Sequence, residues 1–359
     1  MTVTDPLTKE LGQPRPTPDL ATPLNLWVIT LCCVASTIGL AGDIGRHLRS
    51  GTSLTGDFFA SWHLVLYGGV TGAAAWLGHL ALTHGPKAMR DTFGPTTYGV
   101  FVLGIGGASD FAWHSRFGIE VDIAALVSPP HLTILLGLVL MSVGPVNALW
   151  RAGAPKLSWC AAGIVATCTT CIVVIVMLFT GYLSVFSSGI VVNGWLNPMI
   201  GSTTDPTDEI LAIATLVWSS LVFALPWALL SLRWRLRPGM IAATFVVIAA
   251  SSSVAVQGRA GAVVTAILYG GIALDVVVSV LLRWLTGERA AVVIGALTPP
   301  VLWVTLFRQL DAGGQMVWGP AMWVGAIALS SMVTAGVAAM LALVGRSRNG
   351  SPGSAGSQL

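Results

Sequence analysis

Residues 105–132 read IGGASDFAWHSRFGIEVDIAALVSPPHL, and this stretch joins the end of one hydrophobic segment to the start of the next. It carries Asp110, His114, Asp122 and His131. Asp110 and His114 are four residues apart, so a helix places them on one face. His131 opens the following hydrophobic segment, and we expect it to face the other two from the next helix.

An earlier stretch has almost the same pattern. Residues 38–47, IGLAGDIGRH, align with residues 105–114, IGGASDFAWH, without a gap and match at five of ten positions. A His-Leu pair follows each copy, with His63 after fifteen further residues and His131 after sixteen. The motif is therefore Asp-x3-His followed by a second histidine, used twice, and it indicates a tandem duplication of a helix pair.

The composition is that of an integral membrane protein. Of the 359 residues, 54% are hydrophobic and only 9% are charged, whereas soluble proteins carry about 25% charged residues. The mean hydropathy is +0.80. The net charge is +3, but the basic residues are scattered at segment ends, so we expect a lipid bilayer and no nucleic acid as a partner.

Ten apolar segments are long enough to cross about 30 Å of hydrocarbon as helices. They span residues 24–47, 57–82, 96–115, 130–150, 158–184, 208–231, 238–257, 261–284, 290–309 and 317–345. Only helices satisfy their own backbone in lipid at this spacing, so the predicted fold is an all-α, polytopic bundle of about ten transmembrane helices.

Four regions follow from these segments. Residues 1–23 and 346–359 are predicted to be flexible tails. Residues 24–150 form a duplicated four-helix unit that carries both copies of the motif. Residues 158–345 form a six-helix membrane bundle.

The distribution of Lys and Arg predicts that both termini are cytoplasmic. With that orientation thirteen basic residues fall inside and five outside. Both copies of the motif then lie near the extracytoplasmic surface. With no organellar targeting signal apparent, we expect a multi-pass protein of a bacterial plasma (inner) membrane, with its site facing the extracytoplasmic side.

Each copy supplies one acid and two imidazoles at one membrane depth. Ionisable groups are unfavourable in apolar helices, and this combination of ligands suits copper, zinc or iron. The candidate metal ligands are Asp110, His114 and His131 in one set and Asp43, His47 and His63 in the other. Two mononuclear sites, one shared dinuclear site, or one active and one decayed copy are all compatible with the pattern. The alternative is that the Asp–His pairs are interhelical hydrogen bonds with a structural role.

Two further acids, Asp57 and Asp122, lie in the adjoining outer loops. They are candidate general bases or partners that orient a histidine, and the alternative is that they are solvated loop acids. The sequence Ser128-Pro129-Pro130 predicts the start of a helix, because Ser is a good N-cap and Pro suits the first turn.

Two further features lie outside the motif. Cys168 and Cys171 form a C-x-x-C in an apolar segment, where packing is the more common role. Asp275 lies inside another apolar segment, and an acid there suggests a proton relay or a polar partner on a neighbouring helix.

The stretch from Asp110 to His131, with DFAWH at one end and DIAALVSPPH at the other, resembles part of the C subunit of the copper membrane monooxygenases. Those enzymes oxidise methane, ammonia or short alkanes. The resemblance covers about 25 of the 359 residues. It implies that Asp110, His114 and His131 are copper ligands, with zinc or iron as the alternatives from ligand chemistry alone.

Three functional hypotheses follow. The first is a membrane metalloprotein with a copper site, either a copper-dependent oxidase or monooxygenase or a subunit of one, with other membrane subunits as partners. The second is copper or zinc transport, or assembly of a metal site. The third is a zinc-dependent membrane hydrolase with Asp57 or Asp122 as the general base. No P-loop, H-E-x-x-H or G-x-S-x-G motif is present, which disfavours nucleotide-driven transport and the common hydrolase mechanisms.

Overall fold

The structure is a computed structural model of the whole chain. It describes residues 20–50, 61–118, 126–153, 156–183, 185, 206–255, 261–314, 316 and 318–349. Within these residues the fold is all-helical, which confirms the predicted fold class. Most of the predicted tails, residues 1–19 and 350–359, lie outside the described part of the chain.

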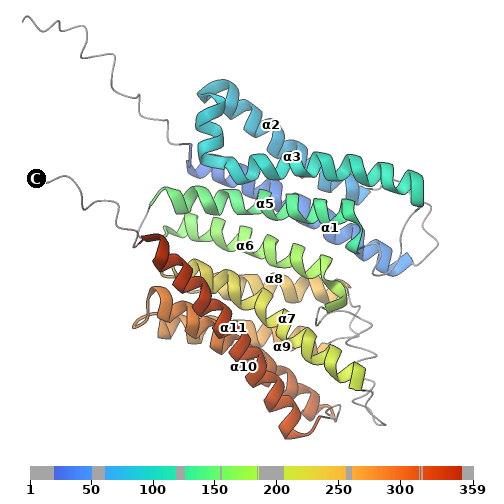
Figure 1. Cartoon of the computed structure of the whole chain (residues 1–359), viewed down its shortest axis with the longest axis vertical. Coiled ribbons are helices and arrows are strands. Elements are labelled where there is room, and N and C mark those ends of the chain that lie inside the picture. The colour runs from blue at the N-terminus through green and yellow to red at the C-terminus, as the bar shows by residue number, and fades with distance from the viewer. Residues whose placement is uncertain are drawn as a thin grey trace, which may run out of the picture.

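Each predicted apolar segment corresponds to one α-helix. The helices are α1 (Pro23–Ser50), α2 (Ser61–His84), α3 (Pro86–Phe117), α5 (Pro129–Arg151), α6 (Trp159–Phe179), α7 (Pro206–Ser231), α8 (Met240–Ala255), α9 (Gly261–Leu281), α10 (Gly287–Ala312) and α11 (Pro320–Asn349), with a 3-10 turn at Gly181–Leu183. They run across the molecule in the same general direction (Figure 1).

Eight of the described helices are long and apolar enough to cross a membrane. α8 is apolar but has only 16 residues, which corresponds to about 24 Å. α3 has 32 residues and is not among the eight; Lys87, Arg90 and Asp91 lie near its start, and Asp110 and Arg116 lie near its end. These helices make the chain a multi-pass membrane protein.

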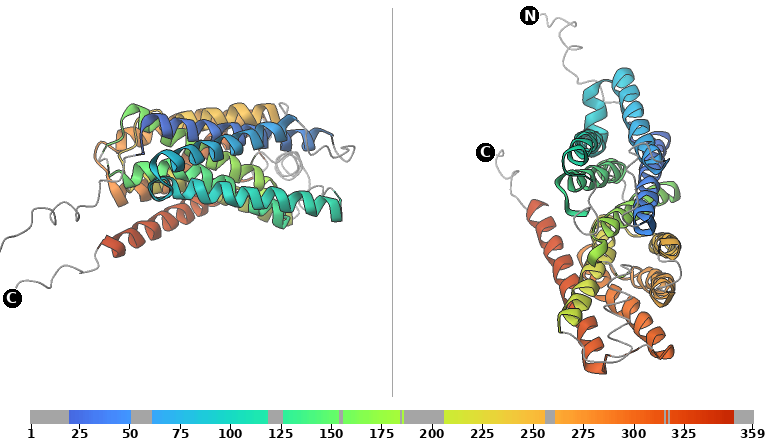
Figure 2. Two further views of the ribbon diagram at one scale, coloured as in Figure 1. Left: turned by 90° about the horizontal axis from the view of Figure 1, so that it is seen from above. Right: turned by 90° about the vertical axis from the view of Figure 1, so that its right-hand side faces the viewer.

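Two hydrophobic cores divide the bundle, and α6 lies between them. One core joins α1, α2, α3 and α5 to one side of α6, including Ile164 and Cys168. The other joins α7 to α11 to the opposite side of α6, including Val165 and Val173. The two groups lie at opposite ends of the long axis (Figure 1, Figure 2). In α6 72% of the spanning residues are buried, against 28–56% in the other seven spans, so this helix joins the two halves.

The helix pairs α1/α2 and α3/α5 come into backbone contact at matching positions. The closeness is seen by asking where a Cβ atom would fall if each glycine carried one. At Gly39 of α1 it would lie 2.3 Å from the Leu66 backbone nitrogen of α2, and at Gly106 of α3 it would lie 3.1 Å from the Ile134 backbone nitrogen of α5. Gly39 and Gly106 are 67 residues apart, the offset of the two aspartates. Only glycine allows helix backbones to approach this closely.

A second contact of the two pairs corresponds in the same way. A Cβ on Gly69 of α2 would meet the Ser36 nitrogen of α1 at 2.8 Å, and one on Gly137 of α5 would meet the Leu103 nitrogen of α3 at 2.9 Å. Gly69 and Gly137 are 68 residues apart, the offset of His63 and His131. The two pairs therefore pack in one register, which brings the end of each first helix beside the start of its second.

The structure corrects the predicted start of the third helix, residue 96. α3 begins ten residues earlier at Pro86, after Gly85 with a positive φ of 90°. The helix continues through Pro95 with a kink at Phe93 (φ −113°, ψ 31°). A proline interrupts the hydrogen bonds of a helix and bends it without always ending it.

Candidate metal centre

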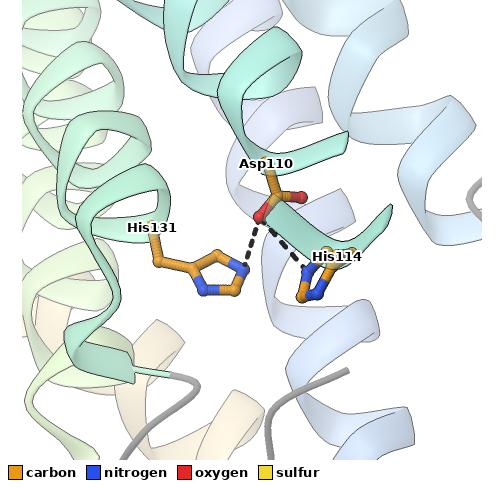
Figure 3. Close-up of side chains that lie close together, drawn as sticks. All are labelled: Asp110, His114 and His131. Atoms are coloured by element: carbon orange, nitrogen blue, oxygen red, sulfur yellow. Dashed lines mark ion pairs between the residues drawn. The ribbon is translucent and has the colours of Figure 1, made fainter. Parts of the chain in front are cut away.

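The second copy of the motif lies where α3 ends and α5 begins. Asp110 and His114 are one turn apart near the C-terminal end of α3, and His131 lies in the first turn of α5. All three side chains point into the space between the two helix ends (Figure 3). The close contact of Gly106 with Ile134, one turn before Asp110, holds the two helices together here.

Asp110 is the centre of this group. Its Oδ1 atom lies 3.3 Å from His114 Nε2 and 3.2 Å from His131 Nε2. Its side chain is only 8% exposed, and the two histidines are about a quarter exposed. One ligand atom from each residue lies within 4.8 Å of the others, and among the described residues this is the only group of three His, Cys, Asp or Glu that meets this distance.

The contacts of Asp110 do not have hydrogen-bond geometry. Its Oδ1 atom is buried and has no hydrogen-bond partner, although two imidazole nitrogens are close. Ligands bonded at about 2.0–2.1 Å to one tetrahedral ion lie about 3.3 Å from each other. The observed distances of 3.2 and 3.3 Å agree with this value, so the three side chains fit a shared metal ion.

The outer nitrogens of the two histidines are held by other groups. His114 Nδ1 lies 3.0 Å from the carbonyl oxygen of Gly118. Because a carbonyl only accepts, Nδ1 carries the proton, and in neutral His114 the lone pair of Nε2 faces Asp110. His131 Nδ1 lies 2.7 Å from the hydroxyl of Ser128, which can accept in the same way. Metal-bound histidines usually donate their second nitrogen to such a partner.

The start of α5 serves the site in a way that the sequence did not indicate. Ser128 is the N-cap residue and Pro129 the first helical residue, as predicted, but the Ser128 side chain makes no capping hydrogen bond. Its buried hydroxyl is directed to His131 instead. The predicted helix start is confirmed, and the serine orients an imidazole rather than capping the helix.

The first copy is assembled in part. Asp43 Oδ2 lies 3.2 Å from His63 Nε2, with the Asp43 side chain 16% exposed. Residue 47 belongs to α1, but the side chain of His47 lies outside the described part of the structure. The candidate general bases Asp57 and Asp122 also lie outside the described residues. The structure thus brings together one complete set and two members of the other.

Tyr67 lies between the two copies and was not recognised in the sequence. Its ring centroid is 6.1 Å from that of His63. Its ring also lies against Gly107 of α3, where a Cβ atom on this glycine would be 3.4 Å from the Tyr67 hydroxyl. It also lines an open groove of about 430 Å³ between α2 and α3, with Val70, Leu103 and Phe111 among the other walls. The only sequence signal was its position one helical turn after His63.

Asp275 has a structural role in this fold. Its carboxylate accepts hydrogen bonds from the backbone nitrogens of Gly239, Ile241 and Ala242 at 2.8, 3.0 and 3.2 Å. These amides form the N-terminus of α8, where a carboxylate satisfies unpaired donors and interacts favourably with the helix dipole. Of the two predicted roles, the polar partner on a neighbouring helix is the one that the contacts support.

Cys168 and Cys171 are buried at the contact of α6 with α1. Cys168 Sγ lies 3.5 Å from the Thr30 hydroxyl. Neither cysteine belongs to a described three-ligand group. These contacts are those expected of packing residues.

Comparison of the chain with protein-family models, with curated proteins and with solved structures found no match.

Proposed function

We propose that this chain is a membrane metalloprotein that binds a transition-metal ion through Asp110, His114 and His131. The observation that carries the proposal is the buried Asp110 oxygen, which lies 3.2–3.3 Å from two imidazole nitrogens without a hydrogen bond to either. In neutral His114 the lone pair of Nε2 faces a carboxylate oxygen, which is unfavourable unless a cation lies between them.

Copper is the metal that we propose, with zinc and iron as alternatives. Two imidazoles and one carboxylate accept all three metals, and the resemblance of the stretch from Asp110 to His131 to the copper membrane monooxygenases favours copper. Three protein ligands leave a coordination position for another molecule, as in catalytic sites. A bound copper ion would supply one-electron redox chemistry at this position.

An oxidase or monooxygenase function, in this chain or in a complex that contains it, follows as the proposed activity. An apolar groove between α2 and α3 lies beside the site: Gly107 and Phe111 line the groove, and Asp110 is between them in sequence but is not part of the lining. The protein residues would hold the metal, keep the imidazoles in one tautomer and admit an apolar molecule from the bilayer. Transport has less support, because Asp275 is bound to backbone amides and offers no step along an inward path.

We further propose that the two helix pairs are copies of one unit and that Asp43, His47 and His63 are a second ligand set. The matching glycine contacts of the two pairs support the duplication. The positive-inside pattern supports cytoplasmic termini and an extracytoplasmic site in a bacterial plasma membrane.

Elemental analysis of the detergent-purified protein tests the proposal. We expect one or two copper ions per chain in the wild type and loss of at least one in His114→Ala. His84→Ala, at the other end of α2, is the matched control and keeps the full content. Loss in His47→Ala as well would indicate that both copies hold metal. Zinc in place of copper would favour a hydrolase, and a metal-free wild type after reconstitution would overturn the proposal.

A further inference from the structure

The connection between α7 and α8 presents a row of arginines. Residues 233–237 read RWRLR. Trp234 and Leu236 are buried, at 2% and 6% exposure, while Arg233 and Arg235 are exposed and Arg237 is half-buried. The backbone nitrogens of Arg233 and Trp234 donate to the Leu230 carbonyl, so the row begins in the turn that ends α7. Arg233 and Arg235 are thus exposed on either side of buried Trp234, and half-buried Arg237 follows buried Leu236.

The connection between α5 and α6 lies against this row. Arg237 Nε donates a 2.7 Å hydrogen bond to the Leu157 carbonyl, and its guanidinium lies 4.5 Å from the Trp159 ring centroid. Gly153 is close to the Arg233 side chain, because a Cβ atom on this glycine would lie 3.8 Å from Arg233 Nη2. These contacts hold the arginine row beside Arg151 and Lys156, which belong to the second connection.

The two connections carry no acidic residue of their own, and two acids lie beside them. Arg151 donates to the backbone carbonyl of Asp91, and the buried Asp275 carboxylate accepts from the Gly239 nitrogen. We define the basic patch as Arg151, Lys156, Arg233, Arg235 and Arg237. Residues 151–159 and 231–240 contain no Asp or Glu. The connection between α9 and α10 differs, because Glu288 accompanies Arg283 and Arg289. The two connections thus bring five cations together without an acid of their own, whereas the connection between α9 and α10 carries one.

The position of the patch matches that of a lipid headgroup. It lies where four apolar helices end or begin, and Trp159 beside it is 67% exposed. Exposed tryptophan at a helix end is typical of the membrane–water interface. Arginine forks match phosphate oxygens in geometry and charge, and basic pockets between transmembrane helices bind anionic headgroups.

We propose that the basic patch binds the phosphate headgroup of an anionic phospholipid. α5 belongs to the first core and α8 to the second, so the bound lipid bridges the two halves of the bundle beside α6. Exposed Trp159 and the apolar helices below the patch receive the acyl chains. This site is independent of the metal centre.

Native mass spectrometry of the full chain tests the proposal, with phosphatidylglycerol and phosphatidylcholine as probes and thermal unfolding in detergent as a check on folding. We expect wild type to retain phosphatidylglycerol in preference to phosphatidylcholine. The double variant Arg233→Gln/Arg235→Gln weakens phosphatidylglycerol binding by about fivefold for each arginine removed. Arg283→Gln/Arg289→Gln is the matched control and changes binding less than about twofold.

Two further measurements separate the alternatives. If the first double variant does not fold, Arg233→Lys/Arg235→Lys replaces it; it keeps the charge and loses the planar forks, and we expect an intermediate affinity. Equal retention of both lipids, or equal loss in the two glutamine variants, would overturn the proposal in favour of a diffuse interfacial charge. Displacement of the lipid by millimolar inorganic phosphate would overturn it in favour of a free-phosphate site.

Discussion

The pairs α1/α2 and α3/α5 share a backbone register and differ in how their aspartates are surrounded. In both pairs, glycines bring the helices into contact one turn before the aspartate. Asp110 then has two imidazole nitrogens within 3.3 Å, whereas Asp43 has one among the described side chains. Asp110 is also the more buried of the two, at 8% against 16% exposure.

The two pairs also differ in the residue that lies three positions before the second histidine. His131 has the Ser128 hydroxyl at its outer nitrogen, while the residue at the corresponding sequence position before His63 is Ala60. A shared register therefore places an acid beside a histidine in both pairs, and the residue three positions before that histidine differs between them. A metal site depends on such outer partners almost as much as on its ligands.

Replacing the two aspartates should give the largest contrast. Asp110→Asn removes the carboxylate that both imidazoles face, and we expect metal affinity at this centre to fall by more than about 100-fold, since loss of a mere ligand partner costs 10–100-fold. Asp43→Asn should leave at least one metal ion per chain. Competitive chelator titration of both variants measures the difference. Equal metal loss in the two variants would show that the copies build one shared site.

Separating the helices without touching a ligand should have the next largest effect. Gly137→Leu places a side chain 2.9 Å or less from the α3 backbone, and Gly69→Leu does the same between α1 and α2. We expect each to lower the free energy of unfolding by about 3 kcal/mol, the upper part of the range for overpacking. Only Gly137→Leu should also lower metal content. Thermal unfolding in detergent and elemental analysis check the two effects, and metal loss in Gly69→Leu alone would contradict the assignment.

The positions of the helices and the grouping of Asp110, His114 and His131 could be predicted from the sequence, because both depend on local patterns. Ten apolar runs match ten helices, and the spacing Asp-x3-His fixes one face of α3. Their ends were less predictable: α3 passes through Pro95 because its kink at Phe93 accommodates the ring. Hydropathy alone does not distinguish a kink from a helix start.

Contacts between distant segments could not be predicted. The pairing of Asp275 with the amides of α8 joins residues more than thirty positions apart. The Ser128 hydroxyl had two local partners available, the α5 backbone and His131, and only the packed structure decides between them. Tyr67 gains its place between the copies from the contact of α2 with α3, which no periodicity encodes.

Ser128→Ala should have a smaller effect, confined to the second copy. The substitution removes the hydroxyl beside His131 Nδ1, and we expect metal affinity to fall by about 10–100-fold. The unfolding free energy should change by less than about 0.5 kcal/mol, below the usual N-cap contribution, because this side chain makes no capping hydrogen bond. Ser115→Ala, whose hydroxyl bonds only to the Phe111 carbonyl, is the control. Unchanged metal affinity in Ser128→Ala would indicate that His131 is not a ligand.

Tyr67→Phe should have the smallest effect and tests whether the copies act together. The variant keeps the ring that packs beside His63 and on Gly107 and removes only the hydroxyl. Because the packing of the ring is kept, we expect the free energy of unfolding to change by less than about 0.5 kcal/mol. Metal affinity should change less than about threefold, since the contacts among Asp110, His114 and His131 do not involve Tyr67. A tenfold loss in chelator titration would mean that Tyr67 couples the first copy to the proposed metal centre, and the two pairs would then be one functional unit rather than two independent sets.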